Sequence, residues 1–218
     1  MATVNCGILD GFYGKVGTVV GSFWKGIPVM RAYVRRQHDA KSETQVVIRA
    51  RFKAMMELVS GFLDASRIGL HDAAAAGPMT EGNMFFVKNW DMVTASGVES
   101  VSVDFTGLTV AQGHLPGVHF NAPQFDTPLQ VDVDFDDNME CRGTSPDDEV
   151  YVFVYCPDAK CGVLSAPAKR SDESVSVKVP SYWNGMKVHV YGFAKGALDS
   201  GRYGQCSDSA YLGTGNIG

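Results

Sequence analysis

Long apolar segments are absent from this sequence of 218 residues. No apolar run approaches the roughly 20 residues that a helix needs to span a bilayer. The first residues contain Asp10 and Lys15 among several glycines, without the basic start and continuous apolar stretch of a signal peptide. We therefore expect a protein that is made in the cytoplasm, has no membrane span, and can be assembled into a particle from there.

Cysteine is scarce and odd in number, with five residues at Cys6, Cys141, Cys156, Cys161 and Cys206. A chain of this length can bury enough apolar surface to fold without disulfides, so we interpret these residues as reduced thiols. Cys156 and Cys161 are close enough in sequence to share a metal ion. However, zinc sites usually add a second close pair or a nearby histidine, and the sequence has neither there. We predict no metal site and no other cofactor.

The motifs of common catalytic and nucleotide-binding sites are also missing. A phosphate-binding loop needs Lys followed by Ser or Thr before a helix, whereas Gly14-Lys15 is followed by Val16. No G-x-S-x-G sequence marks a nucleophilic serine. The acidic run that begins at Asp132 lacks the glycine and glutamate of a helix-loop-helix calcium site. Two interpretations of this acidic run remain, a looser calcium site between strand ends and outward-facing charges that prevent edge-to-edge aggregation. We predict no catalytic residues and a protein that is not an enzyme.

Charge is divided unevenly along the chain. Residues 1–70 hold ten Lys or Arg against five Asp or Glu, whereas the remainder holds nine against nineteen. The basic front part can attract nucleic acid or an acidic partner. It can also attract the acidic rear part, either in the same chain or in another copy, which would give a head-to-tail assembly.

The front part predicts a glycine-punctuated β segment followed by helices. Within residues 7–34, β-branched residues alternate with glycines, which indicates two short strands joined by turns, with Pro28 on an edge strand or at a strand start. Ser42 and Gln45 have capping-box spacing before a helix of about 43–64. Its predicted apolar stripe consists of Ile48, Phe52, Met55, Met56, Val59, Phe62 and Leu63. Thr80 is positioned to cap a second helix.

From residue 98 the apolar pattern changes to a period of two. Alternation around residues 101–105, 129–135, 175–179 and 188–191 predicts half-buried strands, and residues 150–155 are apolar on both faces, which indicates a central strand. The fold class we predict is α+β and β-rich, with an antiparallel immunoglobulin-like β-sandwich after the front part. The predicted domains are a basic part at 1–96 and an acidic sandwich at 97–218.

Two segments carry a family resemblance. The run GFYGKVGTVVGSFWKGIPVMRAYVRR, followed by a helix with GFL near its end, resembles the start of an uncharacterised family of about 200-residue proteins from Bacteroidota and associated mobile elements. The ending at Tyr211-Leu212-Gly213, after Ser207-Asp208-Ser209, is similar to that family's ending. The resemblance implies a domain of unknown function and no catalytic residues.

These observations favour a non-enzymatic structural or protein-interaction component of a phage-derived or surface assembly, with a protein partner or self-association. The alternatives are nucleic-acid binding through the basic front part and glycan binding through the sandwich loops. Trp183 could anchor a sugar ring or equally fill the end of the core. The candidate partner-binding residues are Trp24, Arg31, Arg35, Arg36, Arg49, Arg51, Lys53 and Trp183.

Overall fold

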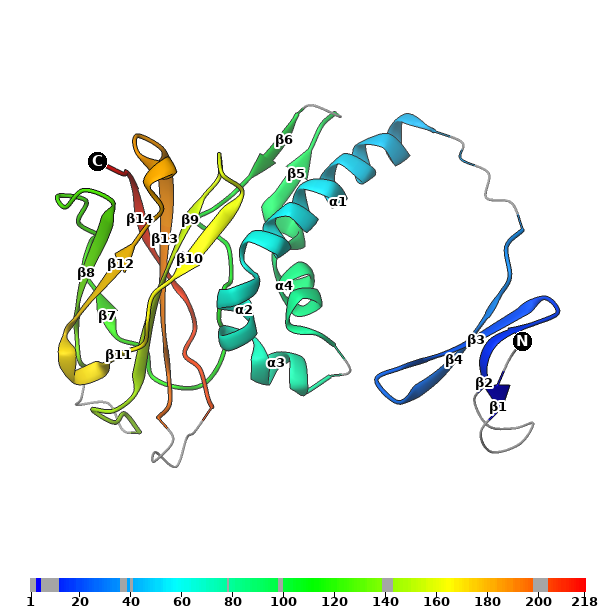
Figure 1. Ribbon diagram of the computed structural model, residues 1–218, viewed down its shortest axis with the longest axis horizontal. Coiled ribbons are helices and arrows are strands. Elements are labelled where there is room, and N and C mark those ends of the chain that lie inside the picture. The colour runs from blue at the N-terminus through cyan, green and yellow to red at the C-terminus, as the bar shows by residue number, and fades with distance from the viewer. Residues whose placement is uncertain are drawn as a thin grey trace. The chain divides into compact units, whose positions relative to one another are not determined.

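The computed structural model describes residues 3–4, 12–35, 39, 41–77, 79–97, 100–138, 143–197 and 204–218 (Figure 1). Its contacts divide the chain into two units, Met1–Ser42 and Glu43–Gly218. This division does not coincide with the predicted boundary between residues 96 and 97. Each unit is described below by itself.

The first unit is an antiparallel sheet, which we call the amino-terminal sheet. Its described strands lie in the order β1-β2-β3-β4, with bounds β1 Thr3–Val4, β2 Phe12–Val16, β3 Val19–Trp24 and β4 Ile27–Ala32. Two-residue turns join β2 to β3 and β3 to β4. Gly17, Lys25 and Gly26 have φ of 58°, 45° and 82° there, the left-handed values that tight hairpins require. The prediction of a glycine-punctuated β segment is confirmed, with three strands over residues 12–32 in place of the two expected, and Pro28 lies on the edge strand β4.

The second unit begins with the helices α1 Glu43–Gly61, α2 Leu63–Gly69, α3 His71–Ala75 and α4 Glu81–Asn89. As predicted, Thr80 caps α4, because its side-chain oxygen accepts a hydrogen bond from the backbone N–H of Asn83 at 3.3 Å. In the part of the chain that the structure describes, none of the helices combines the length and apolar character required to cross a membrane.

Three sheets follow the helices in the described residues, all with antiparallel pairing. The five-stranded sheet has the order β10-β9-β13-β14, with β11 also paired to β9, and the three-stranded sheet has the order β12-β8-β7. A small sheet pairs β5 Val93–Ala95 with β6 Val101–Val103. The remaining bounds are β7 His119–Phe120, β8 Gln130–Asp136, β9 Glu149–Cys156, β10 Cys161–Leu164, β11 Ala168–Lys169, β12 Ser174–Lys178, β13 Lys187–Lys195 and β14 Ala210–Asn216.

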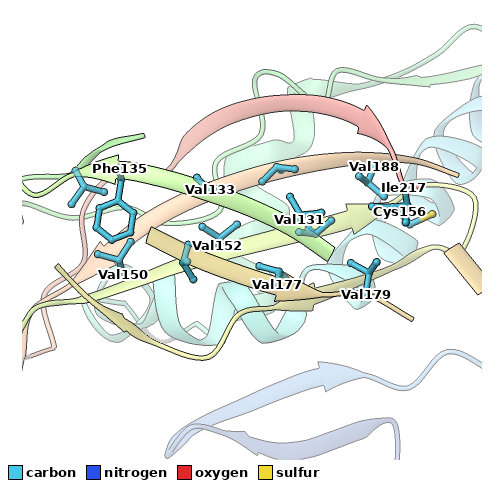
Figure 2. Close-up of a cluster of buried hydrophobic side chains, with 14 of the residues drawn as sticks. Val131, Val133, Phe135, Val150, Val152, Cys156, Val177, Val179, Val188 and Ile217 are labelled. Carbon is cyan, nitrogen blue, oxygen red and sulfur yellow. The ribbon is translucent and has the colours of Figure 1, made fainter. Parts of the chain in front are cut away.

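One core lies between the five-stranded and three-stranded sheets (Figure 2). Alternate residues of β8 and β12 point into it, as the period of two predicts. They meet the even-numbered residues of β9 and β13, so the two sheets pack face to face. Its strand residues include Val131, Val133, Phe135, Val150, Val152, Val154, Cys156, Val175, Val177, Val188 and Val190.

A second core lies between the helices and the opposite face of the five-stranded sheet (Figure 1). Tyr151, Phe153 and Tyr155 of β9 pack here against Met55 and Phe62. The strand β9 is therefore covered on both faces, which confirms the prediction of a central strand at residues 150–155. Because helices and strands share this core, residues 43–96 belong with the rear strands.

His189 on β13 is a buried titratable residue beside this core. Its ring stacks on Phe105 with a centroid separation of 4.2 Å, and its Nδ1 lies 2.9 Å from the Tyr211 hydroxyl. Burial lowers the pKa of His189, and the nearby Lys187 lowers it further. The folded state therefore binds fewer protons than the unfolded state at pH values between this lowered pKa and the ordinary value near 6.5.

We expect the contribution of His189 to stability to be complete above pH ~6.5 and to decline as the pH falls through that value. Denaturant unfolding between pH 5 and 8 checks this for the wild-type protein and His189→Gln. The variant cannot titrate at this position, so its stability should fall less steeply towards acid. Equal slopes for the two proteins would contradict the prediction.

Candidate interaction surface

The strand register assigns every residue of β2, β3 and β4 to one of two faces of the amino-terminal sheet. Directly paired residues share a face, and successive residues along a strand alternate. The pairs Val16↔Val19, Gly14↔Gly21, Gly21↔Met30 and Phe23↔Pro28 fix one of these faces. Its described members are Phe12, Gly14, Val16, Val19, Gly21, Phe23, Pro28, Met30 and Ala32. None of these nine carries a polar or charged side chain, so we call them the apolar face.

The other face, which we call the mixed face, combines aromatic, aliphatic and basic residues. Its members in β2–β4 are Tyr13, Lys15, Val20, Ser22, Trp24, Ile27, Val29 and Arg31. The Lys15 ammonium lies 3.5 Å from the centroid of the Tyr33 ring, a cation–π contact. The two faces of one sheet therefore differ sharply in chemistry.

The apolar face has no core beneath it in the amino-terminal unit. Within residues 12–35, only Gly21 is buried. A Cβ at Gly21 would lie 2.7 Å from Cδ2 of Phe12, so that ring lies over the glycine. The side chains of Val16, Phe23 and Met30 are exposed, Met30 to 66%. An exposed apolar sheet face of this kind is typical of a surface that another surface covers.

A second exposed apolar surface lies on α1 and concerns the predicted stripe. The structure divides that stripe into a buried part, which includes Met55 and Phe62, and an exposed part. Ile48, Phe52 and Met56 are 52%, 50% and 45% exposed and follow one another at four-residue steps. We call these three residues the helix row. The prediction of a single core-packing stripe was wrong for them, because the cover supplied by α4 and the strands reaches only one side of α1.

The predicted partner-binding residues do not form one site. Trp24 and Arg31 lie on the mixed face, and Arg35 is exposed beyond β4. Arg36 lies outside the described residues. On α1, Arg49 and Lys53 are exposed.

Two of the predicted residues have structural positions instead. Arg51 is only part exposed, and its guanidinium stacks on the Trp90 ring at 4.0 Å and donates a hydrogen bond to the Trp90 carbonyl oxygen. Trp183 is fully buried in the core between the sheets. The structure therefore corrects its interpretation as a binding residue, and a glycan site would have to do without it.

A cleft of about 460 Å³ lies in the second unit. Asp72, Gln112, His114, Cys206 and Asp208 contribute to its lining. Burial raises the pKa of the Cys206 thiol to about 11, and the charge of Asp72 adds to the shift. The thiol is therefore protonated at neutral pH, which makes it a poor nucleophile.

Cys156 and Cys161, the candidate metal pair, are direct partners in the β9–β10 register. Cys156 Sγ lies 3.7 Å from Met186 Sδ, and Cys161 Sγ lies 3.6 Å from the Tyr182 hydroxyl. Among the described residues, no group of three or more His, Cys, Asp or Glu side chains is arranged to hold a metal ion. Cys6 and Cys141 lie outside the described residues.

Comparison with known proteins identifies one family. Neither the curated proteins nor the solved structures give a match. A family model, by contrast, matches residues 11–213, which include β2–β4 of the amino-terminal sheet and almost all of the second unit. The chain therefore belongs to the family of unknown function DUF6266.

Proposed function

We propose that this protein is a non-enzymatic structural or interaction component that binds a protein partner through the apolar face. The observation that carries the proposal is the exposure of Val16, Val19, Phe23 and Met30 on a sheet face that has only apolar residues. Burying one such side chain completely stabilises a complex by about 1.5–3 kcal/mol, and roughly half of that is available to a half-exposed one. Covering the whole face would thus supply several kcal/mol.

The extent of the family match supports this proposal. It includes β2–β4 and the second unit in one stretch, so the amino-terminal sheet is part of the family's own domain. For the second unit we propose an immunoglobulin-like sandwich, supported by two antiparallel sheets that pack face to face. A binding sheet joined to such a sandwich suits a repeated subunit of a phage-derived or surface assembly.

Met30→Asp and Tyr13→Asp together test the proposal. These residues are 66% and 67% exposed but lie on opposite faces of the amino-terminal sheet. Met30→Asp places a charge in the apolar face, so we expect partner binding or self-association to weaken about tenfold or more, whereas Tyr13→Asp should have little effect. Sedimentation across protein and salt concentrations, with quantitative binding to any partner identified, measures both. A wild-type protein that is monomeric under every condition and binds no partner would overturn the proposal.

The mixed face favours single-stranded nucleic acid as a second candidate function. The basic residues Lys15 and Arg31 lie on this face together with the aromatic residues Tyr13 and Trp24. Proteins that bind single-stranded nucleic acid combine basic charge, which attracts the backbone, with aromatic side chains on which the bases stack. Fluorescence anisotropy with a labelled oligonucleotide tests this at low salt. Wild-type binding that Trp24→Ala and Arg31→Ala each weaken would support it, and an unchanged anisotropy at low salt would exclude it.

A further inference from the structure

The apolar face and the helix row are apolar surfaces that are each left exposed by the unit to which they belong. We infer that the apolar face of one copy binds the helix row of a second copy, so that the protein associates head to tail. This inference rests on the proposed function and names the partner and its binding surface.

The two surfaces agree in size and type. Ile48, Phe52 and Met56 lie on one side of α1, and eight residues of helix separate the first from the last, a rise of about 12 Å. Three neighbouring strands spaced about 4.8 Å apart present a face about 10 Å across, and six residues extend it to about 20 Å. A helix laid on an apolar sheet face is one of the standard layer packings of proteins.

Net charge favours the second unit of another copy over another amino-terminal sheet as the partner. Residues 1–42 hold six Lys or Arg against two Asp or Glu, a charge of +4, so the rest of the chain carries −9 of the total of −5. Two amino-terminal units meeting face to face would bring like charges together, whereas an amino-terminal unit meeting a second unit joins opposite charges. Arg49 and Lys53 beside the helix row are basic, so this attraction comes from the second unit as a whole and not from α1 itself. The contact is therefore heterologous, between different surfaces of the two copies.

The edge of the amino-terminal sheet is a poorer binding site than its face. Trp24 and Ile27 close the two-residue turn as a hydrogen-bonded pair, so the next pair, Phe23 and Pro28, is not hydrogen-bonded. The backbone nitrogen at position 28 consequently faces the free edge of β4, where proline has no N–H to donate. This obstructs the addition of a further strand beside β4.

A mixing experiment with two variants tests the inference. Met30→Asp disables the apolar face and leaves the helix row intact, while Phe52→Asp does the reverse. We expect the wild-type protein to form oligomers that grow with concentration, because every copy offers both surfaces. Each variant alone should associate at least tenfold more weakly. An equimolar mixture should form a 1:1 dimer and nothing larger, because it contains one intact surface of each kind.

The controls are substitutions to aspartate at equally exposed residues elsewhere. Tyr13→Asp on the mixed face and Tyr182→Asp, where Tyr182 is 59% exposed, should assemble as the wild-type protein does. Circular dichroism of every variant shows whether the fold is kept. Analytical ultracentrifugation and light scattering give the masses.

The outcomes separate this inference from the proposed function. If Met30→Asp abolishes association and Phe52→Asp leaves it unchanged, the apolar face binds some other surface and the head-to-tail inference is overturned while the proposed function stands. Two folded, monomeric variants that fail to pair on mixing would also overturn the inference, because the mixture contains an intact apolar face and an intact helix row that then do not bind each other. If the wild-type protein is a monomer at every concentration and Met30→Asp changes no partner binding, both conclusions fall.

Discussion

Replacing Arg170 with methionine is expected to lower the free energy of unfolding by about 3–5 kcal/mol. Arg170 and Asp148 are fully buried, with 3.4 Å between Nε and Oδ2. The guanidinium also donates hydrogen bonds to the carbonyl oxygens of Asp137 at 2.9 Å and Pro116 at 2.8 Å. Methionine fills much of the volume but provides neither charge nor donors. Asp148 is then a buried charge without its counterion, and the carbonyl oxygens lose a hydrogen bond.

The neighbouring residue supplies a matched control for this prediction. Lys169 forms an ion pair with Asp147 at 2.7 Å, but both side chains are about 60% exposed. Solvent screens such a pair, so Lys169→Met should change the unfolding midpoint little. Urea titrations of the wild-type protein and both variants measure the two effects. Equal midpoints for Arg170→Met and Lys169→Met would show that the burial of the first pair has no energetic consequence.

A double variant tests whether the loss of stability in Arg170→Met arises from the unpaired charge of Asp148. In Arg170→Met/Asp148→Asn, the carboxylate is removed together with its partner. Its loss of stability should be smaller than the sum of the two single losses, because each single variant counts the broken pair once. An additive result would place the cost of Arg170→Met in the lost hydrogen bonds to Pro116 and Asp137 instead.

Patterns along a single segment predicted much of the fold. Residues 150–155 are apolar at consecutive positions because the two faces of β9 contact two different cores. The alternation around Val131 and Val133 follows from the exposure of one side of β8. Thr80 could be identified as a helix cap because the bond it forms is to a residue three positions away. Such features depend on neighbours in sequence, which a single sequence contains.

Features that depend on distant pairing could not be predicted in this way. The burial of Trp183 and of the Arg170–Asp148 pair follows from how loops meet at the ends of the strands. The apolar residues of α1 gave no indication of which side would be covered. The change of the apolar pattern at residue 98 suggested a boundary near residue 96, yet such a change marks only a switch from helices to strands, and the core that they share groups the helices with the strands.

The apolar face, by contrast, left a signal that the prediction did not use. Once two-residue turns are assigned at Gly17 and at Lys25–Gly26, the pairing of β2, β3 and β4 is determined. Assigning alternate residues of each strand to the same face then pairs Val19, Gly21 and Phe23 with Ala32, Met30 and Pro28 on one face. The candidate residues chosen from the sequence were instead six basic residues with Trp24 and Trp183, because charge and large aromatic side chains are visible without knowledge of the register.

Replacing Phe62 with alanine is expected to lower the free energy of unfolding by about 3–5 kcal/mol. The Phe62 ring is fully buried at the junction of α1 and α2. Its centroid lies 4.9 Å from that of Phe153 and 4.5 Å from that of Tyr155, both on β9, and 5.1 Å from that of Phe85 on α4. Alanine would leave a cavity where the helices meet the five-stranded sheet, and the surrounding rings come from elements too rigid to fill it.

Phe52 on α1 is the control, because it is the same residue type at 50% exposure. Its ring packs against Phe86 of α4, at 5.3 Å between centroids, so Phe52→Ala should lower the free energy of unfolding by no more than about 1 kcal/mol. In a measurement of self-association, the order of the two effects should be reversed. Phe52→Ala should weaken self-association by shortening the helix row, while Phe62→Ala, studied below its lowered melting temperature, should assemble normally. A large loss of stability in Phe52→Ala would mean that the helix row serves the fold of its own unit. Unchanged association in that variant would mean that the helix row is not a surface for a second copy.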